Sequence, residues 1–273
     1  MTARPGPQVL QALRHFLLAL QFFTRIPITG SLAAWVGYSP AMLRASSAYF
    51  PAVGWVVGCV AAAAMALALA VLPAGPMAAL AAAFLSTIAT VWLTGAFHED
   101  GLADTADGLG GGVTRERALE IMKDSRIGSY GTAAMGLALG LKVVLLALLA
   151  QRGAWAVAAA LLSAHALSRL APLVVMRSLP YVSDEGHAKS KPIADAATGQ
   201  DFRIACLWSL PALLLIGQAH GAAHLVMALL LWAAALAFTW RLLRRRLQGF
   251  TGDTLGAVQQ VCELALYLGL ALR

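Results

Sequence analysis

The chain has 273 residues, of which 60% are hydrophobic and only 12% are charged, with a formal net charge of +7. Soluble domains carry about 25% charged residues, so this composition and a mean hydropathy of +0.74 favour a multi-pass membrane protein. Basic cytoplasmic loops explain the excess of Lys and Arg, and nucleic acid is therefore set aside as a partner. The three cysteines lie far apart in apolar runs without a CxxC pair, which argues against a disulfide framework or a zinc site.

Apolar runs that could cross a bilayer follow an amphipathic N-terminal segment. Residues 8–23 place leucines at helical spacing between polar side chains, which is typical of a helix at the membrane interface. Each later run approaches the ~20 residues that a helix needs to cross the hydrocarbon core. The expected spans are 48–72, 77–97, 131–150, 154–177, 203–219, 222–240 and 255–272. The sequence predicts one all-α domain over residues 1–273, a polytopic membrane bundle of about seven transmembrane helices plus the N-terminal interfacial helix.

The basic residues predict how this bundle is oriented. If the polar segment 98–130 faces the cytoplasm and the spans alternate, sixteen of the 20 Lys and Arg fall on the cytoplasmic side, in agreement with the positive-inside rule. The long polar segments 98–130, 178–202 and 241–254 then share that side, and the other side has only tight turns. This asymmetry favours a cytoplasm-facing active site over a transport path, which needs gates on both faces.

Four carboxylates fall within nine residues directly after the second expected span. Asp100, Asp104 and Asp107 are spaced i, i+4 and i+7 and so lie on one helical stripe, with Glu99 about a quarter-turn away. Like charges at a low-dielectric boundary repel one another unless a cation binds them, and Mg²⁺ commonly combines carboxylates with substrate phosphates. The metal ligands that we predict are Glu99, Asp100, Asp104 and Asp107. The alternative is a solvated acidic face that caps a helix.

A second polar stretch covers residues 123–131, after a short amphipathic helix that Thr114 is expected to cap. Asp124 offers a further metal ligand, and Arg126 could hold a phosphate with two parallel hydrogen bonds. An ordinary salt bridge between Asp124 and a neighbouring base explains the pattern equally well.

Two cations, Lys142 and Arg169, lie inside apolar runs, where ionisable groups are costly and tend to face the bundle interior. Arg169 is the stronger functional candidate. Lys142 is either structural or extends toward the headgroups. His165, taken alone, is more often a satisfied core histidine than a ligand.

Two more cytoplasmic segments carry candidate substrate contacts. Asp184 and Lys189 lie in the mixed-charge segment 178–202, which suits a cover over a charged substrate or a solvated connector. Thr251 and Asp253 flank a glycine and offer a second carboxylate and a backbone site for phosphate or metal, although turns favour these residues in any case. The residues alone indicate a membrane enzyme that handles a phosphorylated or diphosphate substrate with Mg²⁺ from the cytoplasm.

Six stretches of the chain carry a likeness to a known family, and they follow one another in the family's order. They are Phe23–Pro27, His98–Gly108, Ile121–Gly131, Ser168–Leu170, Leu179–Tyr181 and Thr251–Ala257. Together they resemble the cobalamin synthase family, whose members are adenosylcobinamide-GDP ribazoletransferases. The stretch His98–Gly108 alone is close to diagnostic. The chain departs from the pattern at Gln248, where a glycine is expected, and the pattern tolerates a non-acidic residue at position 99.

The resemblance implies a reaction. A ribose hydroxyl of α-ribazole, or of its 5′-phosphate, attacks the corrinoid-side phosphorus of adenosylcobinamide-GDP and releases GMP, the late nucleotide-loop assembly step of vitamin B12 synthesis. Mg²⁺ and arginines stabilise charge in such phosphoryl transfers. The candidates for the group that takes the hydroxyl proton are Asp104, Asp107 and Asp124. Arg126 and Arg169 are the candidates for phosphate binding.

The expected setting is the bacterial inner membrane, with a multi-pass chain in the lipid bilayer and the active site facing the cytoplasm. A homo-oligomer, or association with other late cobalamin-pathway enzymes, stays open. Two rival functions also stay open. One is another Mg-dependent membrane phosphotransferase, of the CDP-alcohol or prenyl-diphosphate type. The other is a cation-coupled transporter, which would place carboxylates near span midpoints and polar features on both faces.

Overall fold

The computed structural model describes residues 6–183 and 197–272, and this part of the chain folds into α-helices without a strand. The helices are α1 Pro7–Phe23, α2 Gly30–Val36, α3 Pro40–Ala45, the 3₁₀ helix η1 Ser46–Tyr49, α4 Phe50–Val71, α5 Pro76–Thr94, α6 Phe97–Gly110, α7 Arg115–Ile121, α8 Ser129–Ala150, α9 Ala154–Ser168, α10 Ala171–Ser178, α12 Gly199–His220, α13 Ala222–Arg246 and α14 Gly252–Ala271.

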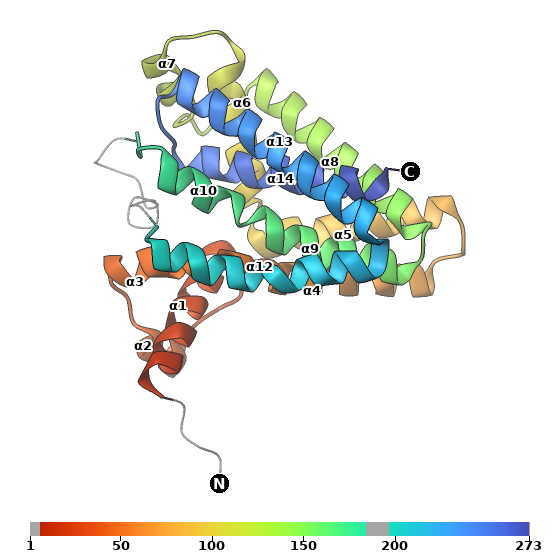
Figure 1. Cartoon of the computed structure of the whole chain (residues 1–273). Helices are drawn as coiled ribbons and strands as arrows, with labels where there is room; N and C mark the ends of the chain where they lie inside the picture. The colour runs from red at the N-terminus through yellow and green to blue at the C-terminus, as the bar shows by residue number, and fades with distance from the viewer. Residues whose placement is uncertain (1–5, 184–196, 273) are drawn as a thin grey trace.

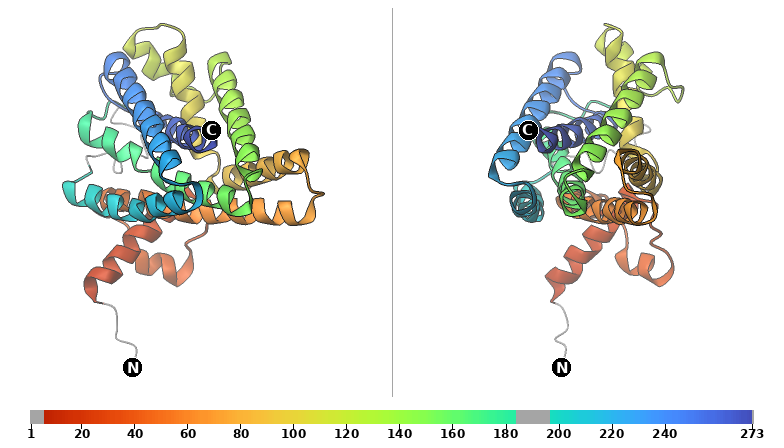
Figure 2. Two further views of the ribbon diagram at one scale, coloured as in Figure 1. Left: turned by 45° about the vertical axis from the view of Figure 1, so that its right-hand side comes forward. Right: turned by 90° about the vertical axis from the view of Figure 1, so that its right-hand side faces the viewer.

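Seven stretches among the described residues are long and apolar enough to cross a membrane, which confirms the predicted multi-pass, all-α class. They are Pro40–Val71, Pro76–Thr94, Ser129–Ala150, Ala154–Ser178, Gly199–His220, Ala222–Arg246 and Gly252–Ala271. Figure 1 shows that α3, α7, the start of α12 and the end of α13 share one end of the bundle, on the left. We call this the α7 end. The α4–α5 turn, the α8–α9 turn and the end of α14 lie at the opposite end (Figures 1 and 2).

The N-terminal helix α1 matches the predicted helix 8–23 and leans away from the long helices (Figures 1 and 2). Its first half exposes Leu10 and Leu13, whereas Leu18, Leu20 and Phe23 in its second half are buried in the core. A helix with one half exposed and apolar and the other half anchored in the bundle fits the expected interfacial position.

Two of the expected segments have different bounds in the structure. The expected span 154–177 is two helices, since α9 ends at Ser168 and α10 starts at Ala171 with Pro172 in its first turn, where the missing N–H is tolerated. The prediction of a basic loop at 241–254 is wrong over most of its length. The reason is that α13 continues to Arg246 with basic residues in its last turn, as the helix dipole favours, and α14 begins at Gly252.

The polar segment 98–130 is folded into α6 and α7. Gly95 and Ala96 have φ of 66° and 59°, so the backbone turns left-handed and ends α5 three residues before the predicted end of the span. Thr114 caps α7 as predicted, because its side chain accepts a hydrogen bond from the backbone N–H of Arg117.

Charged and polar side chains also lie inside the bundle, between α8, α9 and α14. Lys142 Nζ lies 2.7 Å from Glu263 Oε1, with the two side chains 3% and 1% exposed. The second carboxylate oxygen lies 3.3 Å from His165 Nδ1 and accepts a hydrogen bond of 2.6 Å from Gln259 Nε2. Lys142 is therefore structural, because its charge is paired inside the bundle rather than turned toward the headgroups.

We expect Lys142→Met to lower the free energy of unfolding by about 3–5 kcal/mol, because it leaves Glu263 buried without its cation. The double variant Lys142→Met/Glu263→Gln removes both charges and keeps an oxygen for Gln259, and it should recover much of this loss. Thermal unfolding in detergent measures both effects. Val144→Met, whose wild-type side chain is 49% exposed on the same helix, is the control. A double variant as unstable as the single one would contradict the pairing.

Candidate active site

Helix α6 packs against the first turns of α14 with almost no space between the two backbones. A Cβ atom added to Gly101 would lie 2.6 Å from the carbonyl oxygen of Asp253, and one added to Gly256 would lie 3.3 Å from the Cα atom of His98. Glycine at these two positions is what allows the helices to meet. The contact brings Asp253, in the first turn of the last helix, to the acidic stripe of α6.

The acidic stripe is helical, as its spacing predicts. Asp100 is exposed and Asp104, Asp107 and Asp253 are half-buried. Burial, together with the nearby carboxylates of Asp100, Asp253 and Asp107, raises the pKa of Asp104 from 3.8 to about 7. Burial and the repulsion between like charges thus act together to keep a proton on Asp104 near neutral pH.

These carboxylates fit a Mg²⁺ ion that is shared with a substrate. The donors are all hard carboxylate oxygens, and their mutual repulsion favours a cation. Within residues 6–183 and 197–272 no three His, Cys, Asp or Glu side chains are grouped so that they could hold a metal ion by themselves. Mg²⁺ needs no such cage, because it commonly uses one or two carboxylates together with substrate phosphates.

Asp107 has a second role, because it also holds the start of α8. Its Oδ2 accepts a hydrogen bond of 2.7 Å from the N–H of Gly128, and its Oδ1 accepts one of 2.8 Å from the N–H of Gly131. Backbone N–H groups in the first turn of a helix have no partner within the helix. Asp107 therefore caps α8 from a neighbouring helix and ties the acidic stripe to it.

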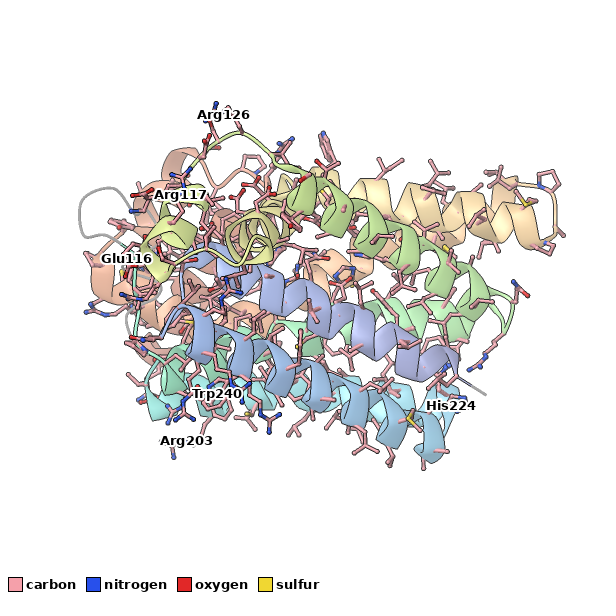
Figure 3. The ribbon with its side chains drawn as sticks, turned by 90° about the horizontal axis from the view of Figure 1, so that it is seen from above. Glu116, Arg117, Arg126, Arg203, His224 and Trp240 are labelled. Carbon is pink, nitrogen blue, oxygen red and sulfur yellow. The ribbon has the colours of Figure 1, made fainter. Side chains whose placement is uncertain are left out.

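In the second polar stretch, residues 123–131, two charged side chains form a salt bridge with each other beside the acidic stripe. Arg126 Nη2 lies 2.6 Å from Asp124 Oδ2, with the side chains 87% and 38% exposed, and Figure 3 shows Arg126 at the outer edge of the molecule. Hydrogen bonds from Arg126 lower the pKa of Asp124 to about 2. The two residues and Asp107 line one open pocket. The ordinary salt bridge that the sequence left as an alternative is thus present.

Two other predicted site residues serve the packing of α14. Glu99 is 5% exposed, and its Oε1 accepts a hydrogen bond of 3.0 Å from Gln260 Nε2, so it faces α14 and lies apart from the three aspartates. Thr251 is buried, and its hydroxyl accepts a hydrogen bond from the N–H of Thr254 as the N-cap of α14. Asp184 and Lys189 lie outside the described residues.

Arg169 lines a pocket beside the acidic site, which we call the aromatic pocket. Its other walls include Phe23, Phe50, Phe97 and His98. The guanidinium Nη1 donates a hydrogen bond of 2.8 Å to the carbonyl oxygen of His165. Burial and the nearby charge of Arg169 lower the pKa of His98 well below its usual value, so this imidazole is neutral at pH 7.

Sequence reasoning missed the polar residues of α14 that face the bundle interior, Gln259, Gln260 and Glu263. A signal for one of them was present. Lys142 and Arg169 lie inside apolar spans, where a cation needs a counter-charge, and Glu263 is the only acid inside the predicted spans. No local pattern indicates the aromatic pocket, because its rings come from α1, α4 and α6.

Comparison with known proteins supports the resemblance over nearly the whole chain. Residues 15–271 match the family model described as cobalamin-5-phosphate synthase. The chain belongs to the cobalamin synthase family. A relative from Polaromonas naphthalenivorans is 55% identical, over 96% of this chain and 99% of the relative, and is named adenosylcobinamide-GDP ribazoletransferase. Relatives with the same name from Albidiferax ferrireducens and Vibrio cholerae are 53% and 42% identical, over 96% and 94% of this chain and 98% and 92% of the relatives. No solved structure matches the chain.

For this member of the cobalamin synthase family we expect Gly101→Ala to be destabilising by about 1–3 kcal/mol, because the added methyl group overpacks the α6–α14 contact. Without this contact the substitution would be stabilising, since alanine is intrinsically the better helix former by about 1 kcal/mol. A loss of stability therefore indicates the close packing. Gly136→Ala in α8, where an added Cβ would meet nothing within 4 Å, should be neutral or stabilising. Thermal unfolding of the two variants in detergent tests the contact, and equal behaviour would contradict it.

The raised pKa of Asp104 predicts how stability depends on pH. Between pH 4 and pH 7 the folded chain keeps a proton on Asp104 that the unfolded chain has lost, so the contribution of Asp104 to the free energy of unfolding falls as pH rises through this window. Asp104→Asn should remove this fall. Asp124→Asn should leave it unchanged, because the pKa of Asp124 is about 2. Unfolding temperatures recorded from pH 4 to pH 8 in EDTA test this, and identical slopes in wild type and Asp104→Asn would refute it.

Proposed function

We propose that the chain is an adenosylcobinamide-GDP ribazoletransferase. It joins α-ribazole, or its 5′-phosphate, to adenosylcobinamide-GDP and releases GMP, the late nucleotide-loop assembly step of vitamin B12 synthesis. The observation that carries the proposal is the 55% identity, over almost the full length of both chains, to a relative with this printed name. The carboxylates gathered by α6 and α14 supply the chemistry that such a phosphoryl transfer needs.

Asp104 is the group that we assign as the base. A base works best when its pKa lies near the operating pH, and in the metal-free site the pKa of Asp104 is about 7. Asp124, with a pKa of about 2, accepts a proton poorly, and both oxygens of Asp107 accept hydrogen bonds from α8. In the proposed step Asp104 takes the proton of the ribose hydroxyl. The freed oxygen forms a bond to the corrinoid-side phosphorus, and GMP leaves with the electron pair of the broken P–O bond.

With Asp104 as the base, Asp100 and Asp253 are the carboxylates that we assign to Mg²⁺. When bound, Mg²⁺ would shield the charge of the diphosphate and stabilise the leaving GMP. The two residues come from the two helices whose backbones meet at Gly101, so the packing of these helices sets the spacing between the backbones that carry them. Arg126 lies on the exposed side of the same region and is assigned to a phosphate once it leaves Asp124.

The active site is assigned to the cytoplasmic side of the bacterial inner membrane. The basic last turn of α13 lies at the α7 end (Figure 1). Figure 3 shows Arg117 and Arg203 at this end too, with His224 at the other, and the positive-inside rule assigns such an end to the cytoplasm. Carboxylates at one end of the bundle favour an enzyme over a transporter, and the full-length family match favours this transferase over phosphotransferases of other types.

We expect the purified chain to release GMP from adenosylcobinamide-GDP and α-ribazole when Mg²⁺ is present, and to stop when EDTA removes the metal. Asp104→Asn should lower kcat by about 10²–10⁴-fold, because it removes the base. Glu116→Gln changes an exposed acid at the same end of the bundle and is the matched control. GMP release and the mass of the corrinoid product are measured together. An inactive wild type, or a fully active Asp104→Asn, would refute the proposal.

A further inference from the structure

A pocket open to solvent lies beside the acidic stripe, and we call it the α7 pocket. Asp107, Asp124 and Arg126 line it, and α7 and the start of α8 add Glu120 and Tyr130 to its walls. Its volume of about 290 Å³ is close to the lower end of the ~300–1,000 Å³ of small-molecule sites. Space of this size admits a single aromatic base with part of its sugar.

The ring of Tyr130 lies flat against the backbone of α6. A Cβ atom added to Gly110 would lie 2.5 Å from Cγ, 2.7 Å from Cδ1 and 2.9 Å from Cδ2 of this ring. Three such similar distances place Gly110 over the face of the ring rather than at its edge. Tyr130 is nevertheless 52% exposed and lines the α7 pocket, so its opposite face is open to a ligand. An exposed aromatic face with a backbone behind it is a platform on which a base can stack.

Glu120 supplies a carboxylate at the wall of the same pocket. Its Oε2 accepts a hydrogen bond of 2.9 Å from Arg117 Nη1, with the two side chains 65% and 63% exposed. Ion pairs as exposed as this one contribute little to stability, so a ligand replaces Arg117 at little cost. Asp124 is less available, because both of its oxygens accept hydrogen bonds from the Arg126 side chain and Oδ1 accepts another from the Arg126 N–H.

A stacking platform beside a carboxylate selects among bases by the hydrogen-bond donors that they carry. A carboxylate binds best to two parallel N–H groups. Among the bases of the common nucleotides guanine alone has two adjacent donors, N1–H and the 2-amino group. The base of α-ribazole carries no N–H group, so it would displace Arg117 and leave Glu120 without a donor in exchange.

We infer that the α7 pocket binds the guanine of adenosylcobinamide-GDP, an inference that rests on the proposed function. The base stacks on the open face of Tyr130, and the Glu120 carboxylate accepts hydrogen bonds from N1–H and from the 2-amino group. Neither residue touches the reacting atoms. Both determine which nucleotide is accepted as the part of the substrate that leaves, here as GMP.

The position of the pocket suits the reaction. Asp107 lines it and is three residues from Asp104, which is about 4.5 Å along the axis of α6. Arg126, which is assigned to a phosphate, lines the same pocket and lies near Arg117 at the α7 end (Figure 3). The guanine pocket and the proposed catalytic Asp104 are therefore about one turn of α6 apart, a separation that one nucleotide spans.

A substrate that lacks only the 2-amino group tests the contact with Glu120. Adenosylcobinamide-IDP carries hypoxanthine, which keeps the ring and the N1–H of guanine. We expect wild type to show about 10- to 100-fold lower kcat/KM for this analogue, the effect of losing one hydrogen bond to a charged acceptor. Glu120→Gln should bring the two substrates within about threefold of each other, because the amide nitrogen cannot accept a hydrogen bond from the 2-amino group. Glu116→Gln, at an exposed acid on the same helix, is the matched control and should keep the preference.

Substitution of Tyr130 provides a second, independent test. We expect Tyr130→Leu to raise the KM for adenosylcobinamide-GDP about tenfold, because stacking on the base is lost, while the KM for α-ribazole stays within about twofold. Tyr130→Phe keeps the flat ring and should leave both KM values within about twofold. A general disturbance of α8 would instead change the KM values of both substrates.

Each outcome of these assays decides the inference. Equal kcat/KM of wild type for the GDP and IDP substrates would overturn it without any variant, and so would a Glu120→Gln enzyme that keeps the preference. A Tyr130→Leu enzyme whose KM rises for α-ribazole instead would assign the pocket to that substrate and overturn the inference too. A wild type that releases no GMP would overturn the proposed function together with the inference, whereas an active wild type without the preference overturns the inference alone.

Discussion

Helices α6 and α14 meet backbone to backbone, and the charged groups of the site take positions that follow from this contact. Gly101 and Gly256 leave no room for a side chain between the two helices. The Asp253 carboxylate therefore comes close enough to Asp104 to raise its pKa, and the same packing pairs Gln260 with Glu99. A single methyl group at Gly101 would force the backbone of Asp253 away from α6.

Charge balance is the second constraint, and it operates inside the bundle rather than at its end. In an apolar interior an unpaired charge is far more costly than a paired one, so Lys142 and Arg169 need carboxylates of their own. Glu263 pairs with Lys142, and the charges of Glu263 and Glu99 act on the guanidinium of Arg169. The aspartates at the α7 end are left with an excess of negative charge, which suits a cation.

Local patterns predicted much of this fold and only part of its site. The seven spans and the stripe of Asp100, Asp104 and Asp107 could be predicted because hydropathy and the helical repeat are local properties. The closeness of Asp253 to this stripe could not be predicted, since the spacing of residues within one helix does not tell which other helix packs against it. The break between α9 and α10 could not be predicted from hydropathy, because apolar residues lie on both sides of it. Gln248 stands where the family pattern has a glycine. Its φ of 56° lies in the left-handed region that favours glycine, so the backbone keeps the conformation that the pattern implies.

The capping and pairing residues of α14 have a consequence for how the chain is made. This helix is synthesised after all the other helices described, so Lys142 and Arg169 enter the membrane before Glu263 exists. Until α14 inserts, the bundle carries excess positive charge in its interior and α6 lacks both Asp253 and Gln260. The last helix therefore brings the counter-charge of Lys142 and the carboxylate of Asp253 in one event. A ribosome-bound chain that lacks it has a buried cation without its partner and only part of the proposed site.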